Sequence, residues 1–157
     1  MNSIDVFSET NPAFCSLVLL SFCEGYELAA ETTVPFPLLI LPIPIILSGD
    51  LLKTFDGTNV KTGFFSWIKN NPVILIKMTE RIEDSQDFIK PAIEFAVSKS
   101  VIGFTPYGEV KTHRENVLNY SNANGASQYF KLANRLGHWL GEIKSVKTIY
   151  NHLGIHV

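Results

Sequence analysis

The sequence predicts a mainly α-helical protein with a small β-hairpin, in which a winged-helix-like core lies between apolar helices at both ends. In residues 62–113, three helical patterns are followed by two alternating segments around a Pro-Tyr-Gly turn. Three helices and a two-stranded wing are the order of a winged helix. The flanking regions are 11–61, with a helix and a proline-rich apolar segment, and 126–157, with further helices. The 157 residues are expected to form a single domain.

The first helix is predicted to begin at Pro12, a residue that suits the first helical position, with Asn11 before it as the N-cap. Gly25 and the acidic stretch that follows are expected to end it near Tyr26. The helix is apolar almost all round, so it must be buried on more than one side. It is either a central core helix or a core helix that also meets a second subunit.

The segment 34–47 is apolar but contains four prolines, at positions 35, 37, 42 and 44. Proline disrupts helices and removes hydrogen-bond donors from strands, so we expect an extended, buried segment with a short edge strand at 38–41. At fourteen residues the run is shorter than the roughly 20 that a membrane-spanning helix needs. A short helix is expected at 51–55.

The predicted core contains helices at 62–70, 72–83 and 85–100, then strands at 101–105 and 109–113. The apolar residues of each helix repeat with helical spacing. Pro91 lies within the third pattern, so this helix either bends there or begins there. The apolar side of the second helix is expected to comprise Val73, Ile74, Ile76, Met78 and Ile82.

A polar loop is expected at 114–125, followed by a long helix at 126–143. Gly137 and Gly141 are spaced by one helical turn and would let another backbone approach closely. Ser145 is placed to cap a last helix at 146–153.

Composition suggests a protein that gives apolar surface to a partner. Hydrophobic residues make up 46% of the chain and charged residues 18%, with a mean hydropathy of +0.15. Residues 1–52 hold six acids and no Lys or Arg, whereas 53–157 hold thirteen basic residues and nine acids. A dedicated DNA-binding domain would be more basic. Cys15 and Cys23 are about 12 Å apart along one predicted helix, too far for a disulfide between them. The N-terminus also lacks the basic start of a signal peptide. We therefore expect a cytoplasmic protein with reduced cysteines that lies outside the membrane.

The candidates for chemistry are few. His138 and Glu142 lie four residues apart on the long predicted helix and could form an acid–base pair or supply two metal ligands. A third ligand with matching spacing is absent from the sequence, so a helix-surface pair is the favoured interpretation. Nucleotide-binding and hydrolase motifs are also absent. We expect a protein that is not an enzyme and that uses no cofactor or metal.

Nucleic-acid and protein binding remain as alternatives. The helix that would enter the major groove, at 85–100, has two acidic and two basic side chains. The acidic side chains would repel DNA, which disfavours direct DNA binding. In the wing, Lys111 and Arg114 could contact a phosphate. A winged-helix DNA-binding transcriptional regulator is therefore the alternative to a protein-docking module. The expected docking anchors are exposed aromatic residues, namely Trp67, Tyr107 and Trp139.

Several segments resemble a known family. They are 11–19 (NPAFCSLVL), the proline-interrupted run 37–47, the helix and hairpin at 95–110, and 148–155 (TIYNHLGI). The sequence resembles the middle components of bacterial three-component ABC systems, most of all the family numbered three, over about 10–157. The resemblance implies an accessory subunit that links an SMC/Rad50-like ABC ATPase to an effector, often a nuclease, in Lamassu-like anti-phage defence. It implies no specific functional residues.

Overall fold

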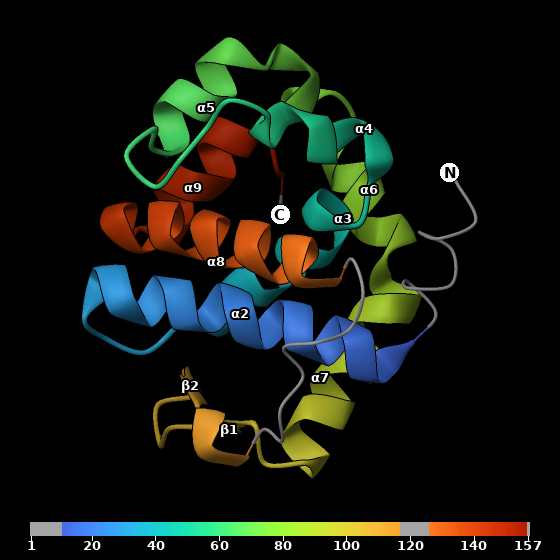
Figure 1. Ribbon diagram of the computed structural model, residues 1–157, viewed down its shortest axis with the longest axis vertical. Coiled ribbons are helices and arrows are strands. Elements are labelled where there is room, and N and C mark those ends of the chain that lie inside the picture. Colours follow the sequence, from blue (N-terminus) through green and yellow to red (C-terminus); the bar gives the residue numbers. More distant parts are fainter. Residues whose placement is uncertain (1–10, 117–125, 157) are drawn as a thin grey trace.

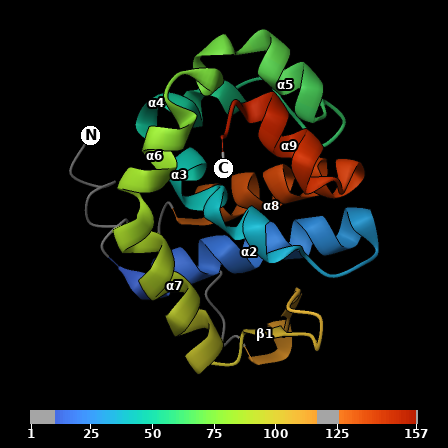
Figure 2. The same ribbon diagram turned by 180° about the vertical axis from the view of Figure 1, so that it is seen from behind.

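A computed structural model describes residues 11–116 and 126–156 and shows a mainly helical protein with a two-stranded antiparallel hairpin. Its centre is a pair of long helices, α2 (Pro12–Ala30) and α8 (Ala126–Ile143), which lie side by side (Figures 1 and 2). Glycines allow this close approach. A Cβ atom added at Gly137 would lie 1.9 Å from the carbonyl oxygen of Phe22, and one at Gly25 would lie 2.0 Å from that of Asn134. The predicted close approach at Gly137 is confirmed.

Helix α2 begins as expected but ends later. The side chain of Asn11 accepts hydrogen bonds from the backbone N–H groups of Ala13 (3.0 Å) and Phe14 (3.3 Å). The helix runs through Gly25 to Ala30, so the prediction that Gly25 helps to end it was wrong. Gly25 lowers helix propensity by about 1 kcal/mol relative to alanine, but here it permits contact with α8. The helix ends at Glu31, in the left-handed conformation with φ 58°.

The proline-rich segment is helical rather than extended, which corrects the predicted edge strand. It forms a 3-10 helix, η1 (Phe36–Ile40), and a short α-helix, α3 (Pro42–Ile46). Both helices are so short that their prolines occupy the first turn, where backbone N–H groups have no partner within the helix. The predicted burial is confirmed for Leu38, Leu39 and all of α3, whereas Phe36 and Pro37 are exposed. The next elements are α4 (Gly49–Leu52) and η2 (Lys53–Phe55).

The second helix of the predicted core is interrupted. After α5 (Phe64–Asn70) the chain forms η3 (Pro72–Leu75), and α6 starts only at Met78 (Met78–Asp84). Lys77 lies between them with φ 57°, a conformation that breaks the helix. As a result Val73 and Ile76 are exposed, by 38% and 55%, although the helical pattern placed them inside.

The third helix, α7 (Gln86–Ser98), contains Pro91 in its interior, so the alternative in which it begins at Pro91 is wrong. The hairpin consists of β1 (Ile102–Phe104) and β2 (Val110–Thr112), within the predicted strands. A backbone bridge joins Val34 to Val110, with N–O distances of 2.9 and 2.8 Å. A 3-10 turn, η4 (Arg114–Asn116), follows. The rest of the predicted loop, 117–125, lies outside the described residues.

A winged-helix arrangement is not confirmed. Helix α5 lies at one end of the long axis, and α7 and the hairpin lie toward the other end (Figures 1 and 2). The α2–α8 pair lies between them, and α7 packs on α2. These helices therefore cover opposite sides of a shared central pair and do not form a compact unit of their own.

The C-terminal helices match the prediction. Helix α8 spans Ala126–Ile143, and Ser145 accepts a hydrogen bond from the N–H of Thr148 (3.2 Å) at the start of α9 (Val146–Leu153). The buried apolar cluster includes residues from all three predicted regions. By length and composition α2 could cross a membrane, but 67% of its most apolar 18-residue stretch is buried inside the fold.

Candidate functional site

Two of the three predicted docking anchors are buried. Trp67 and Trp139 are each 0% exposed, so the expectation of exposed tryptophans was wrong. The indole N–H of Trp67 donates to Oγ1 of Thr54 (2.9 Å), and that of Trp139 donates to the carbonyls of Asn59 (3.2 Å) and Val60 (3.1 Å). Hydrogen bonds of this kind make a tryptophan stable in a core. The two tryptophans are therefore structural in this fold.

The third predicted anchor, Tyr107, is 92% exposed at the turn of the hairpin. Phe104, on β1, is 50% exposed, and its ring lies 5.8 Å from that of Phe36, which is 42% exposed. We call Phe36, Phe104 and Tyr107 the hairpin face. Sequence reasoning missed Phe36, because the bridge between Val34 and Val110 brings it to the hairpin from a distant part of the chain.

Of the two predicted phosphate contacts, Lys111 and Arg114, Arg114 lies against an acidic side chain. Arg114 is already paired with Glu24, with N–O distances of 2.9 and 2.5 Å, and this pairing raises the pKa of Arg114. Glu27, on α2, accepts a hydrogen bond from the hydroxyl of Thr112 on β2. Lys111 is exposed. Carboxylates this close repel phosphate, so the arrangement does not favour a DNA-binding surface. Phosphate contact stays a prediction.

His138 and Glu142 form the surface pair expected on one face of α8. Nδ1 of His138 lies 3.3 Å from Oε1 of Glu142, and the side chains are 22% and 52% exposed. Within residues 11–116 and 126–156, no group of three or more His, Cys, Asp or Glu side chains is placed to hold a metal ion.

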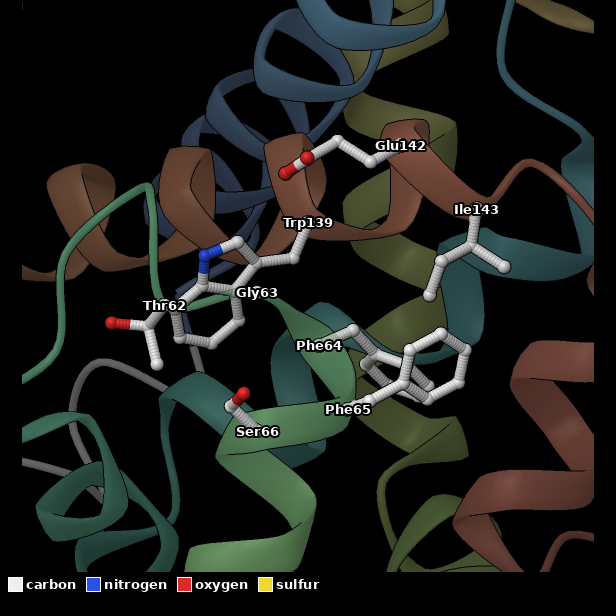
Figure 3. Close-up of a pocket in the computed structure, with 8 residues that line it drawn as sticks. All are labelled: Thr62, Gly63, Phe64, Phe65, Ser66, Trp139, Glu142 and Ile143. Atoms are coloured by element: carbon white, nitrogen blue, oxygen red, sulfur yellow. The ribbon is translucent and has the colours of Figure 1, made fainter.

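A cavity of about 250 Å³ opens between the start of α5 and the end of α8 (Figure 3). We call it the α5–α8 pocket. Phe64 and Phe65 lie on one side of it and Thr62 on the other, with Trp139 between them. The pocket could not be predicted from local sequence patterns, because its walls come from residues 62–66 and 139–143, which are far apart in the chain. Its lining residues are Thr62, Gly63, Phe64, Phe65, Ser66, Trp139, Glu142 and Ile143.

Comparison with known proteins identifies one family. The family model for the ABC-three component (ABC-3C) system Middle Component 3 matches residues 6–157. Neither a curated protein nor a solved structure matches the chain.

Proposed function

The chain belongs to the Middle Component 3 family and is therefore a middle component of an ABC three-component system, and on this premise we propose that it is a non-enzymatic adaptor. In this proposal it links an SMC/Rad50-like ABC ATPase to an effector subunit in a cytoplasmic anti-phage defence complex. Family membership implies that the protein works with the other components of its system. The identity of these partners and the adaptor role are our proposal.

The observation that carries the proposal is the hairpin face. Aromatic residues are prominent among binding hot spots, and isolated exposed aromatics at a turn have no role in the core. Tyr107 is almost completely exposed, and the Phe36–Phe104 pair leaves about half of each ring in water. The hairpin is anchored by the Val34 bridge and by Glu27, so it presents these rings on a supported scaffold.

We assign the ABC ATPase as the occupant of the hairpin face. Carboxylates outnumber basic groups around the hairpin: Glu24 is paired with Arg114, whereas Glu27 and Glu109 accept hydrogen bonds from threonine hydroxyl groups. A partner surface with apolar residues and flanking basic residues would complement it. An ATPase of this class that handles DNA carries such basic surface, since phosphate binding depends on Lys and Arg.

Co-purification of the tagged chain with the ABC ATPase encoded in the same system tests the proposal. The double substitution Phe104→Ser and Tyr107→Ser is expected to reduce recovery of the ATPase by at least about tenfold, because loss of hot-spot residues costs about 2 kcal/mol or more. Val60→Ser is the matched control, since Val60 is an apolar residue with 42% exposure outside the hairpin. Failure of the unchanged protein to bind the ATPase would refute the adaptor role, and equal binding by both variants would refute the assigned face.

A further inference from the structure

We propose that the α5–α8 pocket binds an arginine side chain presented by a partner protein of the complex. The inference rests on the proposed adaptor role only for the source of that arginine. The pocket is separate from the hairpin face, because α5 and the hairpin lie toward opposite ends of the long axis of the molecule (Figure 1).

The charge of the pocket favours a cation. Glu142 is the single charged residue among those that line it, and its side chain is 52% exposed. Its contact with Nδ1 of His138 measures 3.3 Å, longer than the roughly 2.7–2.9 Å of a strong charge-assisted hydrogen bond. An ionised carboxylate has about four acceptor positions. Glu142 therefore keeps acceptor capacity for a second cationic group.

The aromatic walls select a planar cation. Phe65 is 49% exposed, and its ring is held edge-on against His152, with a centroid distance of 4.8 Å. A guanidinium group stacks on aromatic rings and binds carboxylates in a fork geometry, whereas an ammonium group is a compact and strongly hydrated charge. The hydroxyl of Ser66 points toward the space between the two helices (Figure 3) and adds an acceptor for a guanidinium N–H. The pocket is accordingly better matched to arginine than to lysine.

The size of the pocket favours one side chain over a free metabolite. Sites for drug-sized ligands measure about 300–1,000 Å³, and this cavity measures about 250 Å³. The thin aliphatic stem of an arginine would lie against Phe65 and Ile143, with its head group at Glu142. The main chain of this arginine would remain outside the pocket, where it can continue into the rest of the partner protein.

Titration of the full chain with Nα-acetyl-arginine amide, followed by two-dimensional NMR, tests the pocket directly. We expect the indole N–H signal of Trp139 and the amide signal of Ser66 to shift with a Kd of about 1–10 mM, the range of a single weak contact. Nα-acetyl-lysine amide is expected to bind several times more weakly. Absence of shifts with arginine amide, or equal shifts with arginine and lysine amides, would overturn the proposal.

A pair of matched substitutions isolates the carboxylate. Glu142→Gln is expected to weaken arginine amide binding about tenfold, through loss of a hydrogen bond to a charged group. Glu115→Gln should leave binding unchanged. Glu115 also contacts a histidine, His113 at 3.5 Å, but is not among the residues that line the pocket. Equal binding by the two variants would overturn the role of Glu142.

Co-purification with the ABC ATPase and the effector then tests the source of the arginine. If Glu142→Gln reduces recovery of either subunit while Glu83→Gln, at an exposed position of α6 away from the pocket and the hairpin, does not, a partner protein supplies the side chain. If both variants recover the partners fully, the pocket does not serve the complex and the proposal is refuted, although the adaptor role stands. If the unchanged chain recovers neither subunit, the adaptor role and the partner source both fail, and arginine binding is judged by NMR alone.

Discussion

Replacement of Gly137 by alanine is expected to destabilise the protein, against the usual effect of this change in a helix. The added Cβ would lie 1.9 Å from the carbonyl oxygen of Phe22, and contacts below 3.0 Å are essentially never seen. Helices α2 and α8 would have to separate by at least about 1.1 Å, the difference between these two distances. The atom in the way belongs to the backbone of a buried helix, so rotation of a side chain cannot relieve the clash.

Two opposing effects set the magnitude. Alanine has a higher helix propensity than glycine and would contribute about 1 kcal/mol of stability. Overpacking of a well-packed core costs about 1–3 kcal/mol, and a clash with backbone belongs at the upper end of this range. The expected net loss in the free energy of unfolding is about 2 kcal/mol. For a chain of this size, the melting temperature should fall by about 4–8 °C.

Thermal unfolding followed by far-ultraviolet circular dichroism measures this difference. Gly103→Ala is the matched control, because its Cβ would meet only the end of the His113 side chain, at 3.2 Å. Gly141→Ala should lie between the two, with a distance of 2.6 Å to the carbonyl oxygen of Tyr26. A melting temperature for Gly137→Ala equal to or above that of the unchanged protein would show that α2 and α8 can accommodate a Cβ atom at this crossing, contrary to the prediction.

Three further outcomes are expected. A hydrogen bond from Arg81, 2.6 Å away, lowers the pKa of Asp50 from 3.8 to about 2. The stability that this ion pair contributes is present above pH 4 and lost as the pH falls toward 2. Since Asp50 is largely exposed, this loss in the free energy of unfolding, measured with urea, should be under about 1 kcal/mol. The loss should be absent in Arg81→Met. Trp67→Phe removes the hydrogen bond to Thr54 and should cost about 1–3 kcal/mol in urea unfolding, so unchanged stability would contradict it. Burial, and to a smaller extent the charges of Glu27 and Glu24, raise the pKa of Cys23. A thiol reagent at pH 8 should therefore modify Cys23 only after unfolding. Rapid reaction of Cys23 in the native protein would contradict this.

Features of the fold that depend on neighbouring residues were predicted well. The caps at Asn11 and Ser145 and the bounds of α8 follow from side chains within a few positions of the element they define. The strands of the hairpin also lie within their predicted ranges, because alternation and a Pro-Tyr-Gly turn are local signals. The close approach at Gly137 was predicted too, although its partner helix was not.

Features that depend on distant contacts were predicted poorly. The same helical pattern that correctly placed Ile74, Met78 and Ile82 inside also placed Val73 and Ile76 there. These two are exposed because residues 72–75 form a separate 3-10 helix and the left-handed Lys77 starts α6 in a new direction. Periodicity cannot show such a break, since lysine has no preference for that conformation. The burial of Trp67 and Trp139 depends on polar partners in other elements, which a helical pattern does not reveal.

Local signals were enough to predict a mainly helical protein with a hairpin and the N-caps of α2 and α9, because caps and turns are properties of short stretches of chain. The family was recognised from the order of several such stretches. Which aromatic residues reach solvent is apparent only in the folded protein. The fold also spreads the predicted core unit over both sides of the α2–α8 pair, and α5 and α8 enclose a pocket with a carboxylate at its edge. Local signals cannot show this, because burial is a competition among all apolar surfaces of the chain. Its outcome depends on which helices can approach most closely, and here three glycines without side chains placed α2 and α8 at the centre.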